Sequence, residues 1–275
     1  MSSEWGHDGG RRVTPGLIDV TVPNAARAFD FLYGGVDNFA ADRKAATALV
    51  ESAPSTAAIP ASARAFRRRV VRHLAADAGI RQFLDVGDGM VPAANTHEIA
   101  QAADPSCRVV YVESDPMMLD LASATLTSAP GGVVTCVDGD IADVNGIIAT
   151  AGLTGVDPGQ PLAVLLLSSL AHVRSAADAA KVVAALMDPA PSGSYLAIHH
   201  LASDLDPALT IALKQWNAAA AVPIVLRSSA EIAALAVGLD LVPPGLVPVN
   251  DWRPDESDPP APAQVPIHGL VARKP

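Results

Sequence analysis

From residue 80 onward, short runs of apolar residues alternate with longer segments whose apolar residues recur at helical spacing. The apolar runs predict strands at 80–86, 107–113, 133–138, 161–168 and 193–199. The segments between them predict helices at 92–103, 115–128, 143–150 and 175–187. Strands and helices that alternate in this way form a parallel sheet with helices on both faces, so the pattern predicts an α/β fold.

The pattern changes after this alternating region. Helices are predicted near 205–220 and 228–236, and two weaker strands follow at 238–242 and 265–272 with a proline-rich stretch between them. We expect these last strands to form an antiparallel pair at the edge of the sheet, which brings the predicted sheet to seven strands.

Three segments of different character are predicted along the chain. Residues 1–22 are polar and glycine-rich and predict a flexible N-terminal arm. Residues 23–79 predict three helices, and residues 80–275 predict the sheet domain. The third of these helices, predicted at 61–78, carries five closely spaced arginines that cannot all share one helix face. Most of them are expected at the surface, with one or two reaching inward, and for Arg64 and Arg67 the alternative to a surface position is to grip an anionic substrate.

Composition narrows the classes of partner. The net charge is −10, which disfavours nucleic acid and anionic membranes as partners. No signal peptide is evident, and the longest apolar run, residues 162–167, is too short to span a membrane. The two cysteines lack the close spacing typical of metal ligands, so no metal site is expected. With so few cysteines, a reduced, cytoplasmic protein is predicted.

Candidate site residues follow the predicted strands, where ligands bind in open α/β sheets. The first strand ends in Asp85, Gly87 and Gly89, and the second ends in Glu113 and Ser114. Later strands end in or are followed by these polar or site-forming residues: Asp140, Ile141, Ser168, His172, His199 and His200. A glycine turn followed by an acid one strand later is typical of a nucleotide-type site.

The glycine turn departs from the dinucleotide fingerprint. That fingerprint needs a third glycine, but Pro92 stands in its place, and the carboxylate of Asp88 would repel a pyrophosphate. An NAD-dependent oxidoreductase is therefore disfavoured. The turn suits the zwitterionic S-adenosylmethionine (SAM), with Asp85 and backbone N–H groups at its amino-acid end. Glu113 would then hold the ribose hydroxyls, and Asp140 with Ile141 the adenine.

Several longer motifs also resemble a known family. They are Gly34-Gly35-Val36-Asp37-Asn38-Phe39-Ala40-Ala41-Asp42-Arg43, Arg64-Ala65-Phe66 with Arg69, Ile80 to Gly87, Asn95 to Gln101, Gly245 to Val249 and Trp252 to Asp255. With them the chain resembles the actinobacterial SAM-dependent methyltransferase family, formerly a family of unknown function. The resemblance implies a class I, Rossmann-like methyltransferase fold with a seven-stranded, mostly parallel sheet, an antiparallel edge pair and an N-terminal helical cap. It also implies that residues 23–79 form this cap and that a cap segment with Tyr33 and Asn38 covers the SAM pocket. The product formed from SAM would be S-adenosylhomocysteine.

Several functions stay open at this point. We expect a methyltransferase that acts on a small molecule in secondary metabolism, with His200 or His172 as the catalytic base at the acceptor side. Each histidine taken alone has a structural role as its alternative. Family members usually have Thr or Ser where this chain has Asp88, and this departure motivates a second hypothesis, a cyclisation or other reaction without methyl transfer. A third hypothesis is a non-catalytic subunit of another enzyme; a homodimer or a partner protein is left open.

Overall fold

A central sheet organises the molecule. The computed structural model describes residues 19–87, 95–255, 258 and 265–275, so nearly all of the predicted arm lies outside the described residues. The strands are β1 Gln82–Val86, β2 Arg108–Glu113, β3 Val133–Asp138, β4 Ala163–Leu167, β5 Tyr195–Leu201, β6 Asp240–Leu241, β7 Val247–Pro248 and β8 Ile267–Arg273. All seven predicted strands are present, and β7 is an additional two-residue strand that pairs with β8.

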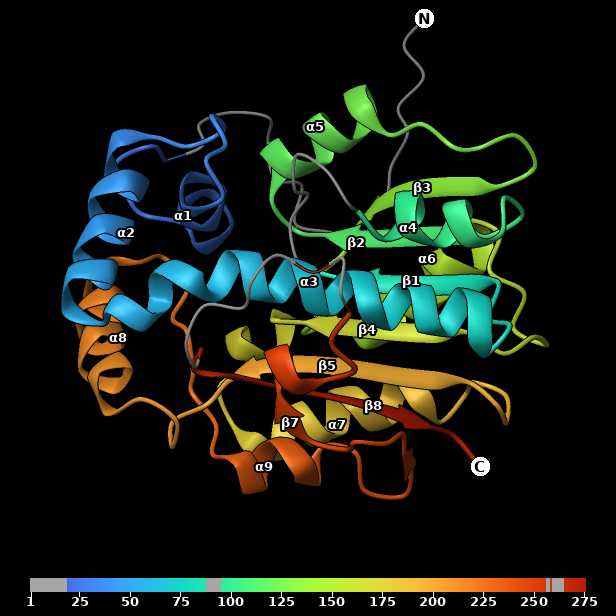
Figure 1. Cartoon of the computed structure of the whole chain (residues 1–275). Coiled ribbons are helices and arrows are strands. Elements are labelled where there is room, and N and C mark those ends of the chain that lie inside the picture. Colours follow the sequence, from blue (N-terminus) through green and yellow to red (C-terminus); the bar gives the residue numbers. More distant parts are fainter. Residues whose placement is uncertain (1–18, 88–94, 256–257, 259–264) are drawn as a thin grey trace, which may run out of the picture.

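The strands follow the order β3-β2-β1-β4-β5-β8-β6 (Figure 1). Strands β1 to β5 are parallel, whereas β8 is antiparallel to both β5 and β6, which confirms the predicted antiparallel edge. Strand β5 begins and ends two residues later than the predicted strand 193–199, because its pairing with β8 continues to Leu201 opposite Ile267. His199 and His200, predicted as the last residues of this strand, are both followed by a further paired residue, and their side chains point to opposite faces of the sheet.

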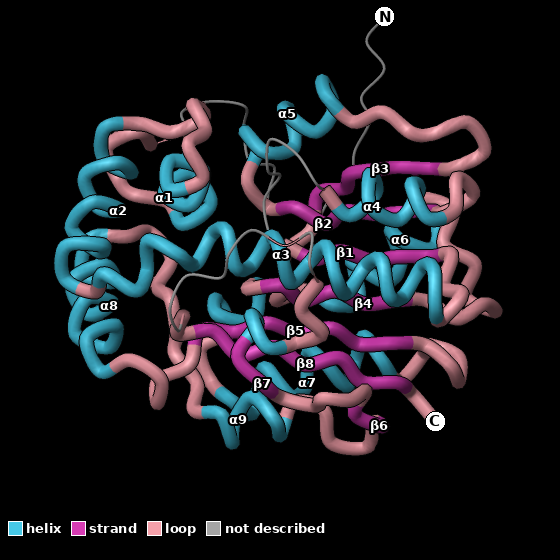
Figure 2. The backbone as a smooth tube through the Cα atoms, in the orientation of Figure 1, coloured by secondary structure: helices cyan, strands magenta, loops and turns pink. Residues whose placement is uncertain are grey.

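Helices cover both faces of the sheet and one of its ends. They are α1 Ala25–Leu32, α2 Ala40–Ser52, α3 Ile59–Arg72, α4 Thr96–Ala103, α5 Pro116–Thr125, α6 Val144–Leu153, α7 Ala176–Met187, α8 Pro207–Ala219 and α9 Ser229–Ala234. Helices α3 and α4 cross one face, α6 and α7 lie behind the sheet, and α1 and α2 lie beyond one end of the strands (Figures 1 and 2). The parallel strands run toward that end, so the cap helices stand over their carboxyl ends.

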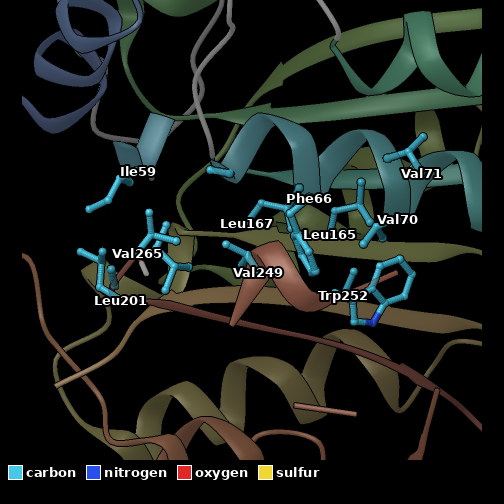
Figure 3. Packing of buried hydrophobic residues seen from close by; sticks show 14 of the residues in the cluster. Ile59, Phe66, Val70, Val71, Leu165, Leu167, Leu201, Val249, Trp252 and Val265 are labelled. Atoms are coloured by element: carbon cyan, nitrogen blue, oxygen red, sulfur yellow. The ribbon is translucent and has the colours of Figure 1, made fainter. Parts of the chain in front are cut away.

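Two hydrophobic cores lie on the two faces of the sheet, and β4 contributes to both. Its residues Leu165 and Leu167 belong to the core on the α3 side, whereas Val164 and Leu166 belong to the core on the α7 side. A strand that is buried on both faces needs a continuous apolar run, which explains the sequence of β4. Figure 3 shows Phe66 of α3 over Leu165, close to Trp252, and the Phe66 and Trp252 ring centroids lie 5.7 Å apart.

Helix α3 is more deeply packed than its arginine content predicts. Arg67 and Arg69 are buried, Arg64 and Arg68 are half-buried, and only Arg72 of the five is exposed. Arg69 donates from Nε to the carbonyl of Trp252 at 2.7 Å and from Nη2 to the carbonyl of Val249 at 2.5 Å. These bonds explain the burial of Arg69. The surface expectation was wrong for Arg67, which is buried and whose charge acts on Tyr33, Asp85 and His199.

A buried ion pair joins the first two cap helices. Nε of Arg27 lies 2.9 Å from Oδ2 of Asp42, whose side chain is fully buried. Asp42 also accepts from the backbone N–H groups of Asn24 and Phe39, at 2.8 and 2.9 Å. One carboxylate therefore holds the start of α1 against the start of α2. The cap and the sheet share one apolar cluster, and the domain division at residue 79 stays a prediction.

Candidate functional site

A cavity of about 840 Å³ opens at the carboxyl ends of the parallel strands, beneath the cap. Its walls come from the starts of α1 and α3, the ends of β1, β2, β3 and β4, and parts of α6 and α7. A cavity of this volume is within the range of small-molecule and cofactor sites. Its position is the one that an open α/β sheet favours for a ligand.

Most of the predicted site residues meet in this cavity. Those that line it are Gly87, Glu113, Ser114, Asp140, Ile141, Ser168, His172 and Tyr33. Three do not line it: Asp85, Asn38 and His200. Gly89 and Asp88 lie outside the described residues. Chain segments far apart in sequence thus converge at the carboxyl ends of the parallel strands.

Gly87 marks the point where β1 reaches the cavity. Its φ is +64°, a conformation that favours glycine, and a Cβ atom there would lie 3.3 Å from Cβ of Ser169. Its backbone N–H is already used, because it donates to the carbonyl of Val112 at 2.8 Å. Gly87 therefore serves the site through the space it leaves and not through its own amide.

Glu113 presents a fixed carboxylate at the end of β2. Its Oε1 accepts from the backbone N–H groups of Ser114 and Asp115, at 2.9 and 3.0 Å. Only 9% of the residue is exposed, although it lines the cavity. Two amide donors on one oxygen hold the carboxylate in one orientation, which suits a group that must recognise a pair of hydroxyls.

Asp85 is buried and does not line the cavity. Its Oδ2 accepts from the hydroxyl of Thr96 at 2.6 Å, while Oδ1 is buried without a hydrogen bond among the described residues. Burial raises the pKa of the Asp85 carboxyl, and the positive charge of Arg67 and the Thr96 hydroxyl oppose that shift. An unsatisfied carboxylate oxygen this deep is costly unless a ligand or water reaches it.

Asp140 and Ile141 follow β3 and line the cavity. Oδ1 of Asp140 accepts from the backbone N–H of Ala142 at 2.9 Å, so this residue also closes a local turn. Asp140 can therefore close a turn and also face a ligand, because the turn directs residues 139–145 along the cavity wall.

The cap contributes an aromatic and apolar wall. Tyr33 lines the cavity, and the guanidinium of Arg64 lies over its ring, 4.5 Å from the centroid. Burial raises the pKa of the Tyr33 hydroxyl, with Arg67 and Arg64 opposing. Asn38 lies behind this wall and donates from Nδ2 to Oδ2 of Asp30 at 2.8 Å. Asn38 therefore supports the loop after α1 and does not face the cavity.

Three histidines lie near the carboxyl ends of β4 and β5, in different environments. His172 lines the cavity, and its Nδ1 lies 3.4 Å from the carbonyl of Pro223. Burial lowers the pKa of His172, so its ring is neutral at pH 7. His200 is fully buried, donates from Nδ1 to the carbonyl of Leu201 at 2.8 Å and accepts at Nε2 from Arg227 at 2.5 Å.

His199 lines the cavity but was not among the predicted catalytic residues. Its Nδ1 lies 3.1 Å from the hydroxyl of Ser168, and its ring meets the edge of Phe66 with centroids 6.0 Å apart. Burial, the charge of Arg67 and the neighbouring His200 lower the pKa of His199 to about 3. The period-two alternation of a strand extended to Leu201 was the signal that could have selected His199 over His200.

The electrostatic character of the cavity is acidic. The described lining residues include the five carboxylates of Glu113, Asp115, Asp140, Asp143 and Asp178, against the two cations Arg174 and Lys181. Lys181 lies 2.8 Å from Asp178, so that pair is locally neutral. A site of this kind favours a ligand that carries a positive charge. No cluster of His, Cys, Asp or Glu in the described part of the chain could hold a metal ion.

SAM fits the described lining of this cavity. Its sulfonium is a cation, its ribose has two vicinal hydroxyls for the fixed carboxylate of Glu113, and the absent side chain of Gly87 leaves room beside Ser169. The buried Oδ1 of Asp85 and the buried hydroxyl of Ser169 have no hydrogen-bond partner in the described structure. Such groups are expected where a polar ligand completes a site.

Comparisons with known proteins identify the family of this chain. A family model described as S-adenosyl methyltransferase matches residues 12–275. The structure of a DUF574 family protein from Streptomyces avermitilis is 36% identical, with a TM-score of 0.89, and the match covers 94% of this chain and 99% of that one. A candidate methyltransferase from Thermobifida fusca is 33% identical, with a TM-score of 0.84 and coverages of 93% and 96%. A search of curated proteins found no match.

A more distant structure supports the fold alone. An O-methyltransferase family protein from Burkholderia thailandensis is 17% identical, with a TM-score of 0.50, and the match covers 75% of this chain and 55% of that chain. The mostly parallel sheet with an antiparallel edge is the class I methyltransferase architecture, as predicted. The cofactor is SAM. The family model covers nearly the whole chain and two solved relatives exceed 30% identity, so this protein belongs to the S-adenosyl methyltransferase family.

Proposed function

We propose that this protein transfers the methyl group of SAM to a small-molecule acceptor. One observation carries the proposal: a single cavity joins the cofactor-side residues Gly87 and Glu113 to an apolar wall from the cap. That wall includes Phe29, Ile59 and Ala63. A volume of about 840 Å³ leaves room for a second small molecule beside the cofactor, but not for a folded partner.

The cofactor would be held at the ends of the first three strands. Glu113 would accept hydrogen bonds from the ribose hydroxyls, and Asp140 with Ile141 would line the adenine. The surplus of carboxylates around the cavity favours a cationic ligand. Bound SAM supplies an electrophilic methyl group, and the residues of this chain orient the acceptor and move its proton.

His172 is the proposed base at the acceptor side. The hydrogen bond to the carbonyl of Pro223 assigns the ring proton to Nδ1, which leaves Nε2 as an acceptor. Burial lowers the pKa of His172, so it is neutral at pH 7 and can take the proton that an acceptor hydroxyl or amine loses on methylation. The hydroxyl of Ser168, which hydrogen-bonds His199, would help to orient that acceptor.

His200 is not retained as the base in this proposal. Arginine has only donors, so the bond from Arg227 requires Nε2 of His200 to be an acceptor, and the bond to Leu201 requires a proton on Nδ1. Both ring nitrogens are therefore occupied within the protein, away from the cavity lining.

The proposed setting is secondary metabolism in the cytoplasm of an actinobacterium. The two close structural relatives come from Streptomyces and Thermobifida, and both cysteines of this chain are free thiols, in keeping with a reducing compartment. No helix among the described residues is both long enough and apolar enough to cross a membrane.

Calorimetry with SAM and S-adenosylhomocysteine tests the cofactor part of this proposal. We expect E113A to weaken binding of S-adenosylhomocysteine about 10- to 100-fold, since a lost hydrogen bond to a charged group costs roughly 1.5–3 kcal/mol. The matched control is E51A, because Glu51 is exposed on α2, away from the cavity. Equal affinity of E113A and wild type would overturn the role of Glu113.

A second experiment tests methyl transfer itself. The protein is incubated with SAM and a small-molecule extract of an actinobacterium, and mass spectrometry follows S-adenosylhomocysteine and methylated products. Matched formation of both supports the proposal. Tight SAM binding without either product favours a reaction other than methyl transfer, and absence of SAM binding favours a non-catalytic partner subunit.

A further inference from the structure

The short segment that carries His172 has few hydrogen bonds of its own. It begins with the 3₁₀ helix Ser169–His172 after β4 and continues to Ser175, the N-cap of α7. Inside the segment, the N–H groups of Ala171 and Val173 donate to Ser168 and Leu170, at 2.8 and 3.1 Å. A 3₁₀ turn of this length is weakly held by its own bonds, so neighbouring groups decide where it lies.

The connection between α8 and α9 supplies those neighbouring groups. Arg227 donates from Nη1 to the carbonyl of Leu170 at 2.7 Å and from Nη2 to the carbonyl of Val173 at 2.6 Å. A longer bond of 3.3 Å joins Nη2 to the carbonyl of Ser175. The backbone N–H of Val225 donates to the carbonyl of Ala171 at 2.8 Å. Four carbonyls of the segment 170–175 are thus held by residues 225 and 227.

Arg227 is an unusual cation because no ion pair accompanies it among the described residues. The residue is 2% exposed, and its guanidinium is bonded only to backbone carbonyls and to His200. Burial lowers the pKa of Arg227, although the charge of Glu231 opposes that shift. A buried cation with neutral partners depends on every one of them, since loss of an acceptor leaves a donor unsatisfied.

His200 fixes the orientation of the Arg227 guanidinium. Its Nδ1 proton is held by the carbonyl of Leu201, so the ring is locked in the tautomer whose Nε2 accepts from Arg227. His200 and Leu170 share Nη1 of Arg227 as their donor, which leaves Nη2 for Val173 and Ser175. The position of the guanidinium is therefore set from β5.

We propose that Arg227, oriented by His200, is a positioning residue that holds the segment 170–175 and with it the His172 ring in the cavity wall. The same connection places Val222 in the cavity lining and the Pro223 carbonyl against His172. The importance of these hydrogen bonds for catalysis rests on the proposed role of His172. The positioning itself is a property of the protein without ligand and is tested without any turnover.

Hydrogen exchange of the full-length protein tests the positioning. In R227K, one ammonium replaces a fork that reaches three carbonyls and His200, so we expect the amides of Ala171 and Val173 to exchange at least about tenfold faster. The matched control is R69K, which alters another buried arginine bonded to backbone carbonyls, those of Trp252 and Val249. R69K should leave exchange at Ala171 and Val173 unchanged. Equal protection of these amides in R227K and wild type overturns the proposal.

A pair of His200 variants separates positioning from simple loss of stability. H200L removes the acceptor for Arg227, whereas H200Q keeps a side-chain oxygen that can accept from it. We expect the NMR titration midpoint of His172 to move upward by roughly half a unit in H200L, as the loosened ring gains solvent, and to stay at the wild-type value in H200Q. An unchanged midpoint in both variants overturns the role of His200. Absence of methyl transfer would sink the proposed function while leaving both results intact.

Discussion

The hydroxyl of Ser168 lies 3.1 Å from Nδ1 of His199, and the backbone N–H of Ser168 donates to the carbonyl of the same histidine at 3.1 Å. These two bonds join the ends of β4 and β5 at the lining of the cavity. Ser168 makes them with φ at +77°, a left-handed conformation that costs a non-glycine residue on the order of 1–3 kcal/mol. Strain of this kind persists only where the surroundings impose it, and here it lies in the proposed acceptor site.

Substitutions at Ser168 should separate the backbone strain from the hydroxyl. S168A loses the hydrogen bond and keeps the strain, so we expect it to lower the free energy of unfolding by about 1 kcal/mol. S168G loses the same bond but relieves the left-handed strain, so its stability should exceed that of S168A by about 1 kcal/mol. Urea denaturation of the two variants measures the difference. Equal stability of S168A and S168G would contradict the assigned conformation.

His172 should titrate at lower pH than an ordinary histidine. Burial disfavours its charged form and lowers its pKa from 6.5, while the charge of Asp140 and the bond to Pro223 oppose the shift without reversing it. A base must be neutral to act, so methyl transfer to an acceptor that loses a proton should fall on an acid limb centred below pH 6.5. An NMR titration of the ring, assigned with H172Q, measures the pKa directly. A midpoint at or above 6.5 would rule out this environment.

Two buried histidines should make the protein sensitive to acid. Burial is the main reason that the pKa values of His199 and His200 fall to about 3 and about 4. Between pH 6.5 and these values the unfolded chain binds more protons than the folded one, so stability is complete above 6.5 and is lost as the pH falls. We expect the free energy of unfolding to decrease across this range by a few kcal/mol.

A single variant checks that assignment. H200Q removes one of the two titrating rings, so its stability should depend less steeply on pH between 6.5 and 4 than that of wild type. Chemical denaturation at a series of pH values gives both slopes. Parallel slopes would show that His200 does not contribute to the acid sensitivity.

The loop after α1 should tolerate no side chain at Gly35. A Cβ atom there would lie 1.9 Å from Oδ1 of Asp30, whose other oxygen accepts from Asn38. We expect G35A to lower stability by about 1–3 kcal/mol, because the buried Asp30 side chain has little room to move. The control G152A lies within α6 with nothing within 4 Å of the added methyl. Alanine has the higher helix propensity, so G152A should be neutral or more stable by up to about 1 kcal/mol.

G35A also tests how the cap contributes to the site. Tyr33 lies two residues before Gly35 and lines the cavity, so a displaced loop should weaken binding of S-adenosylhomocysteine in calorimetry. G152A should bind it like wild type. Unchanged affinity in a destabilised G35A protein would separate the cap loop from the cofactor site.

The sheet and the SAM site follow from residues that are close together in the sequence. The continuous apolar run of β4 and the alternation of runs with helical segments predict a parallel sheet, because each strand must be buried on both faces. The acid at the end of β2 and the turn at Gly87 predict a SAM site, since the carboxyl ends of parallel strands converge. These features depend on residues close together in sequence and on a rule about sheets.

Only the tertiary structure shows which of the candidate histidines faces the cavity and which arginines of α3 are buried. His199 and His200 are neighbours in sequence, and the pairing of β5 with β8 as far as Leu201 turns one to the cavity and the other to Arg227. Arg67 is a charged residue of the kind expected at the surface, yet it is buried because α3 has packed neighbours on more than one side. Both outcomes depend on contacts between segments far apart in the chain. Local periodicity carries no information about those contacts. The sequence therefore determined the sheet and the cofactor of the protein, whereas packing decided which neighbouring side chains face the site and which are buried elsewhere.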